Sequence, residues 1–222
     1  MIPFVQSTMT KLMIYVYLVI LSVCSAINGN GLGIAQAQVI DTNGQALTQT
    51  FNTNGQPVSQ TITTRGGALT QTFDTYGGLV DQRIDTGIGA VVQTFRTYGG
   101  SISQVINTNG GAVTQVFDTQ GGPVTQTIYT RGGAVTQTIH TQGGIRSQTI
   151  DTGGGALTQT FDTTRGAVTQ IIHTQGGIRS QTIDTAGGVL SQTFDTIRGN
   201  QTQIIDTTGG PLSQIIDIDN MP

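Results

Sequence analysis

The residue types that usually carry catalysis or metal binding are scarce in this chain of 222 residues. Its single cysteine is Cys24, its single lysine is Lys11, and it contains no glutamate. Two histidines, His140 and His173, stand where most repeat units have aspartate, and they are copies of each other within a duplicated segment. A nucleophile, a general base and a group to orient that base do not occur together. We therefore predict that the protein is not an enzyme and uses no cofactor and no metal ion.

Aspartate recurs at one fixed position, directly after a large apolar residue, as at Asp151, Asp162 and Asp184. Stacked carboxylates on one face repel each other unless water or a cation screens them. One interpretation is contact with calcium or a mineral surface. The other, which we favour, is a row of charges that keeps the protein soluble and discourages lateral aggregation. Asn200-Gln201-Thr202 also fits a glycosylation sequon, although Thr202 falls within an expected strand.

The region from residue 38 to 217 is built from an 11-residue repeat. Ile or Phe occupies every eleventh position from Ile40 to Ile216, and we call these seventeen residues the anchors. Gln stands two residues before every anchor, and Thr stands two residues after sixteen of them, Ile218 being the exception. Stacked units that share one hydrogen-bond ladder must keep phase in this way, whereas a disordered chain has no reason to.

Within each unit the residues alternate between two faces, as a β-strand requires. In segment 69–75 (LTQTFDT), one face carries Leu, Gln, Phe and the last Thr, and the other carries the remaining Thr residues and Asp. The first set varies least between units, so we predict that it faces inward. The x-Gly-Gly that follows is typical of a turn because Gly tolerates positive φ. Each unit thus predicts one strand, roughly 26 Å long, and a tight turn.

Two strand types alternate, which adds a period of 22 residues. The anchor is Ile in eight of nine odd units and Phe in five of eight even units. We predict an all-β fold, a flattened two-sheet β-solenoid of 22-residue coils in which each coil contains two strand-turn units. The alternative is a long antiparallel β-meander, whose apolar face would need a cover. We favour the solenoid because it pairs the inward Gln amides along the axis, and an unpaired buried amide costs about 1–3 kcal/mol.

The duplication mentioned above places a near copy of residues 140–172 at residues 173–205. It spans three units rather than two, so it moves Phe161 onto Phe194 and exchanges the two strand types. We therefore expect the two sheets to be nearly interchangeable.

The repeat resembles that of curli-type functional amyloid subunits, whose units are strand-turn-strand with Gln on either side of a Gly-rich turn. Here Gln71 and Gln82 flank Gly77-Gly78. The resemblance extends over residues 38–217, but the Ser and Asn positions of the curli motif are not reproduced. It implies an architecture rather than an ancestry.

Threonine fills the outward positions of the even strands more often than those of the odd strands. A solenoid would place these hydroxyl and methyl groups about 6.7 Å apart along strands and about 4.8 Å apart between coils. This face is similar to the T-x-T face of insect antifreeze solenoids, which implies ice or surface binding. Asp and Arg96 share the face, and Thr is in any case favoured in strands. The candidate surface-binding residues are Thr48, Thr50, Thr70, Thr72, Thr94, Thr114, Thr136, Thr138, Thr158, Thr160, Thr182 and Thr202.

The N-terminus differs from the repeat region. Lys11 precedes an apolar run over residues 12–23, and Ser25-Ala26 follows, which is the layout of a secretory signal peptide. We predict a signal peptide over residues 1–26, a linker or N-terminal cap over 27–37, one repeat domain over 38–217 and a C-terminal tail over 218–222. Cleavage after Ala26 would remove the only cysteine, so stability would not depend on disulfides.

Beyond Ala26 the charged residues are eight arginines and twelve aspartates. This acidic balance argues against nucleic acid and anionic membranes as partners. We expect a secreted, extracellular structural protein, such as a matrix, coat, silk or shell component, that acts through a regular self-stacking β surface. The alternatives are an ice-binding antifreeze protein that uses the Thr-rich face, and a secreted adhesin or effector. Self-association is the expected partnership, with ice or a mineral surface as a further possible contact.

Overall fold

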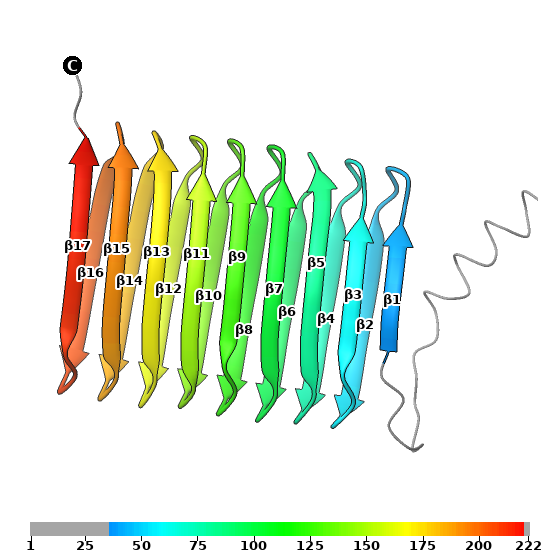
Figure 1. Cartoon of the computed structure of the whole chain (residues 1–222), viewed down its shortest axis with the longest axis horizontal. Coiled ribbons are helices and arrows are strands. Elements are labelled where there is room, and N and C mark those ends of the chain that lie inside the picture. The colour runs from blue at the N-terminus through cyan, green and yellow to red at the C-terminus, as the bar shows by residue number, and fades with distance from the viewer. Residues whose placement is uncertain (1–35, 220–222) are drawn as a thin grey trace, which may run out of the picture. The chain divides into compact units, whose positions relative to one another are not determined.

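The structure is a computed structural model that describes residues 36–219, and these residues form seventeen β-strands (Figure 1). No helix in this part of the chain is long and apolar enough to span a membrane. In chain order the strands are β1 (Gln36–Asp41), β2 (Leu47–Asn54), β3 (Val58–Thr63), β4 (Leu69–Tyr76), β5 (Leu79–Gly87), β6 (Val91–Tyr98), β7 (Ser101–Thr108), β8 (Val113–Gln120), β9 (Val124–Thr130), β10 (Val135–Gln142), β11 (Ile145–Thr152), β12 (Leu157–Thr164), β13 (Ala167–Gln175), β14 (Ile178–Ala186), β15 (Val189–Ile197), β16 (Asn200–Thr208) and β17 (Leu212–Asp219).

The strands form two parallel sheets, one behind the other in Figure 1. The odd sheet contains the nine odd-numbered strands in chain order, and the even sheet contains the eight even-numbered strands. Each strand pairs with the strand two further along, so that residue i lies beside residue i+22, as Gln49 does beside Gln71. The predicted β-solenoid of 22-residue coils is confirmed. The antiparallel meander is wrong, because consecutive strands lie in different sheets and strands within a sheet run parallel.

The inward face is the one that the repeat predicts. The Val/Leu position, Gln, the anchor and the following Thr are buried in nearly every coil between the first and the last. The even-sheet anchors Phe51, Phe73, Phe95 and Phe117 stack ring on ring with centroids 4.7–4.8 Å apart. The odd-sheet anchors from Ile62 to Phe194, such as Ile106, are fully buried beside them. The apolar core is therefore a set of columns that run along the solenoid axis.

The buried glutamines form a continuous amide network between the two sheets. The Nε2 of Gln93 donates to Oε1 of Gln71 in its own sheet at 2.8 Å and to Oε1 of Gln82 in the opposite sheet at 2.9 Å. The Oε1 of Gln93 in turn accepts from Gln115 and Gln104. Both amide hydrogens and the carbonyl oxygen are thus satisfied. Burial of a polar group costs little when it is paired in this way, which explains why Gln is tolerated in the core of every coil.

The turns continue the ladder from coil to coil. The amide N–H of Gly99 donates to the carbonyl oxygen of Gln120 at 2.7 Å, one coil further on. In five of the turns from the odd to the even sheet, the hydroxyl of the inward Thr closes the turn, as Thr86 Oγ1 does by donating to the carbonyl oxygen of Gly89 at 2.8 Å. The second Gly of each x-Gly-Gly packs directly against the backbone of the preceding coil. A side chain at that position would push the coils apart.

Two arginines occupy core positions. Arg146 in β11 and Arg179 in β14 stand where most other units have Val or Leu, and each is 2% exposed. The guanidinium of Arg146 lies over Phe117, 4.8 Å from the ring centroid, and Nη2 donates to Gln126, while Nε and Nη1 have no hydrogen-bond partner. Burial lowers the pKa of Arg146 well below its usual value and that of Arg179 to about 9. The cause in both cases is desolvation, which disfavours the charged guanidinium, so we expect each buried arginine to lower the free energy of unfolding.

The predicted signal peptide (residues 1–26) lies outside the described residues, as does most of the predicted linker. The strands themselves run from residue 36 to residue 219.

Candidate functional surface

The outer face of the even sheet carries all of the candidate threonines. They occupy two columns, one three residues before the anchor and one directly before it, and all are exposed or half-buried. Thr50, Thr72 and Thr94 are consecutive in one column, and Thr136 and Thr158 are consecutive in the other. The in-register pairing of parallel strands therefore brings these hydroxyl and methyl groups into a regular two-column array, as the sequence indicates.

Each threonine column has two gaps. Val92 and Ser180 interrupt the first column, and Val116 and Ile204 interrupt the second. Both columns are filled on neighbouring strands in two places. Over β2 and β4, Thr48 lies beside Thr70 and Thr50 beside Thr72. Over β10 and β12, Thr136 lies beside Thr158 and Thr138 beside Thr160. We call the twelve threonines, taken together, the Thr surface.

A charged row runs beside the Thr surface, at the position directly after the anchor. On the even sheet Arg96 lies between Asp74 and Asp118 in the register of neighbouring strands. His140 likewise lies between Asp118 and Asp162, and its Nδ1 is 3.5 Å from Oδ2 of Asp162. Arg96 and His140 thus alternate with aspartates over β4–β12, so this part of the row is not a run of carboxylates alone, and the repulsion expected of a purely acidic row is reduced.

The same arrangement recurs on the odd sheet. His173 lies between Asp151 and Asp195, with its Nδ1 3.3 Å from Oδ2 of Asp195. The duplication has placed one histidine on each outer face, each flanked by two aspartates. No group of three or more His, Cys, Asp or Glu side chains placed to hold a metal ion is found over residues 36–219.

The outer face of the odd sheet is less regular. Arg83, Val105 and Ile171 occupy the position directly before the anchor, where the even sheet mostly has Thr. Tyr129, which is 45% exposed, replaces Asp in the charged row. The two faces of the solenoid therefore differ, and only the even face presents a threonine array.

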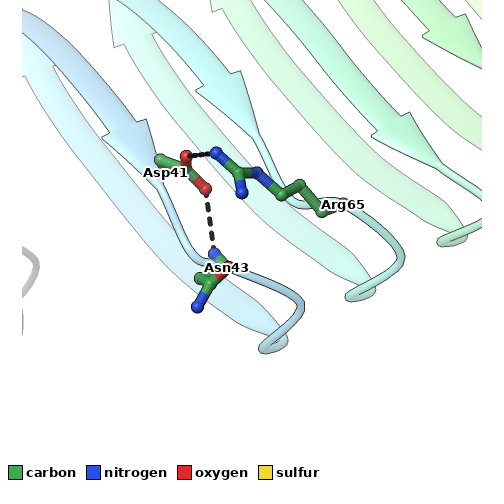
Figure 2. A network of polar contacts seen from close by, with 3 residues as sticks. All are labelled: Asp41, Asn43 and Arg65. Atoms are coloured by element: carbon green, nitrogen blue, oxygen red, sulfur yellow. Dashed lines mark hydrogen bonds and ion pairs between the residues drawn. The ribbon is translucent and has the colours of Figure 1, made fainter.

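The first turn shows how a carboxylate links two coils (Figure 2). Asp41 Oδ1 accepts from the backbone N–H of Asn43 at 2.9 Å, and Asp41 Oδ2 pairs with Arg65 Nη2 at 2.8 Å. Asn43 and Arg65 occupy equivalent turn positions in successive coils, and both have φ of 50°. The side chains are largely exposed, so this ion pair contributes little to stability and mainly orders the turn.

Asn200 of the candidate sequon is the first residue of β16 and is exposed, with Thr202 two residues further along the same strand. The buried arginines were not anticipated from the sequence. The sequence did contain a signal for them, because an Arg at a position that is mostly Val, Leu or Ile interrupts an apolar column. The positions of His140, His173 and Arg96 between aspartates could be predicted only from the register between coils. The 22-residue length of a coil gives that register.

Comparison of the chain with protein-family models, with curated proteins and with solved structures gave no match.

Proposed function

We propose that this chain is a secreted, non-enzymatic structural protein that acts outside the cell through self-stacking of its β-solenoid. The observation that carries the proposal is the C-terminal end of the solenoid. Leu212 and Ile216 in β17 are both 45% exposed, whereas their equivalents Leu190 and Phe194 in β15 are fully buried. An edge strand with apolar core positions open to solvent is a template for another β-strand.

Charge and hydrogen bonding support the same proposal. The interior is held by columns of equivalent residues, with Gln in every unit and mostly Ile, Phe, Val or Leu beside it, and further coils can extend these columns with the same side-chain chemistry. The outer charged rows keep the broad faces hydrated, so growth along the axis is favoured over lateral clumping. In this respect the architecture is similar to curli-type amyloid subunits. Secretion rests on the signal-peptide layout of residues 1–26, and N-terminal sequencing of secreted protein should begin at Ile27.

The test is to follow the size of the purified protein over days at high concentration. We expect growth into fibres whose diffraction contains the strand spacing of about 4.8 Å. Replacing Leu212 and Ile216 with Lys puts inward-pointing charges on the end strand and should stop growth. The matched control is Thr125→Lys, on an exposed outward position of β9 away from both ends. A wild-type protein that stays monomeric indefinitely would refute the proposal.

A second candidate function, ice binding, is favoured by the Thr surface. Its two columns lie on one parallel sheet with the strand spacing repeated over β2–β16. In this case the protein acts as a soluble monomer, and it should produce thermal hysteresis. Replacing Thr72, Thr138 and Thr160 with Tyr should abolish that hysteresis, and replacing Thr61, Thr127 and Thr149 on the odd sheet should leave it intact. Ice crystals that keep their ordinary shape in the wild-type protein would end this candidate.

A further inference from the structure

The glutamine network has a direction. From Gln60 to Gln181, each Nε2 donates to the glutamine 22 residues earlier and to the glutamine 11 residues earlier. Gln192, Gln203 and Gln214 continue the 22-residue series. The amide N–H groups therefore all point toward the N-terminal end of the solenoid, and the carbonyl groups all point toward its C-terminal end.

The two ends of the network are consequently complementary. At the C-terminal end, Oε1 of Gln203 and Oε1 of Gln214 receive no donor from residues 36–219. At the N-terminal end, Gln38 and Gln49 are the first members of the two columns, so within residues 36–219 neither has a glutamine 22 residues earlier to accept from its amide. Two C-terminal ends would bring carbonyl oxygen against carbonyl oxygen. Donors meet acceptors only when the N-terminal end of one copy meets the C-terminal end of another, which is a heterologous contact that extends into a filament.

The number of strands then determines how the copies are rotated. β17 belongs to the odd sheet, so the next position along the solenoid path lies in the even sheet, on β16. We propose that each added copy continues this path, with its β1 on β16 and its β2 on β17, and is therefore turned by half a revolution about the axis. This inference rests on the proposed self-stacking and specifies its geometry. The alternative, β1 on β17, would leave the even sheet one strand short at every junction and expose the ladder groups of β16.

The side chains at such a junction match. Gln38 would lie beside Gln203 and Ile40 beside Ile205, while in the other sheet Leu47 would lie beside Leu212 and Gln49 beside Gln214. The amide of Gln38 would then reach Oε1 of both Gln203 and Gln214, which repeats the bonding inside the chain. On the outer face, Val39 and Ile204, which are 87% and 63% exposed, would become neighbours.

The half-turn requires that the same repeat unit can fit into either sheet. The chain already contains one sequence that occurs in both sheets. The sequence IRSQTIDT forms β11 in the odd sheet and, within β14, recurs in the even sheet. Both copies keep the same pattern of buried and exposed positions over their first four residues, and both place Gln and Ile in the core. The backbone of the two sheets is thus similar enough that a strand of one sheet can stack on the other.

The test uses engineered disulfides in the full chain with Cys24 changed to Ser. Equivalent residues on neighbouring strands lie about 4.8 Å apart, within the range that a disulfide spans. Ser213, Thr48 and Ala37 occupy the same outward position in β17, β2 and β1. The half-turn predicts that Ser213→Cys with Thr48→Cys yields a reducible ladder of covalent multimers, and that Ser213→Cys with Ala37→Cys yields none. Ser191→Cys with Ser213→Cys, a directly paired couple within one chain, is the positive control.

Sedimentation of the same samples shows whether filaments form at all. It therefore distinguishes a failure of the proposed self-stacking from a failure of the half-turn. If no variant assembles, including the parent with Cys24→Ser alone, the proposed self-stacking is wrong. If filaments form and the pair with Ala37→Cys is the one that cross-links, self-stacking stands and the half-turn is overturned. Filaments in which neither pair cross-links, although the control pair closes, also overturn the half-turn.

Discussion

At the scale of single residues, the most informative side chains are the buried glutamines. Gln104 donates to Gln82 and Gln93, and it accepts from Gln115 and Gln126. Its four partners belong to four different strands, two in each sheet. A single side chain therefore helps to connect five consecutive units, and its effect on stability should exceed that of any surface position.

Replacing Gln104 with Leu tests this role. The amides of Gln115 and Gln126 would each lose one acceptor in a core that water does not reach. At about 1–3 kcal/mol for each orphaned group, we expect the free energy of unfolding to fall by about 2–6 kcal/mol, measured by denaturant unfolding. Gln120→Leu, at an exposed position at the end of β8, is the control and should change it by less than about 0.5 kcal/mol. Equal losses in the two variants would contradict the role of the network.

Replacing the buried Arg146 should have the opposite effect and increase stability. Its neighbours in the odd sheet are Val124 and Val168, so Arg146→Val would complete an apolar column and remove a buried charge that no carboxylate balances. Replacing buried charges with apolar residues is often stabilising by about 1–4 kcal/mol. We expect a higher midpoint of thermal unfolding, with Arg83→Val on the outer face of β5 as the control. A lower midpoint would mean that the contact with the rings of Phe117 and Phe161 outweighs the desolvation of the guanidinium.

At the scale of strands and turns, the two glycines of each turn have different roles. Gly121 has φ of +84° and open space around its Cα, whereas Gly122 lies against the backbone of Gly100 in the preceding coil. Gly121→Ala should cost only the strain of positive φ, about 1–2 kcal/mol. Gly122→Ala should cost more, because the added Cβ would overlap the carbonyl oxygen of Gly100. Comparing the two unfolding midpoints tests this difference, and a larger loss for Gly121→Ala would show that backbone conformation, rather than coil spacing, limits the turn.

Much of the arrangement of strands and turns could be predicted from the sequence. The 11-residue spacing, the 22-residue alternation and the inward Gln and anchor positions predict the strands, their faces and their register, because stacked coils must repeat whatever a strand buries. The Thr surface follows from the same register. The direction of the amide network does not, because a Gln column can donate toward either end. The depth of Arg146 and Arg179 was also missed, since Arg at a core position is normally excluded by the cost of desolvation.

At the scale of the whole molecule, the solenoid consists of units that contact only their neighbours in the stack, so its length should be adjustable. Deleting residues 111–121 joins Gly110 to Gly122 and removes one unit, which transfers every later strand to the opposite sheet. Deleting residues 111–132 joins Gly110 to Gly133 and removes a whole coil, which leaves the later strands in their sheets. Because the chain already accepts one sequence in both sheets, we expect both variants to fold, with β-rich circular dichroism and a somewhat lower unfolding midpoint.

The two deletions differ in the parity of their units, and this decides how copies stack. The wild type and the full-coil deletion have an odd number of units, so the half-turn should persist in both. A gold label can be attached to Cys in Thr70→Cys variants in which Cys24 is changed to Ser. In these two proteins the label should alternate between the two sides of a filament. The single-unit deletion has an even number, so successive copies should stack without rotation and all labels should lie on one side, as seen by electron microscopy. If the labels alternate in all three proteins, the rotation between successive copies does not depend on whether the last coil has one strand or two. If the single-unit deletion unfolds while the full-coil deletion folds, the sheets are not interchangeable and the half-turn has no structural basis.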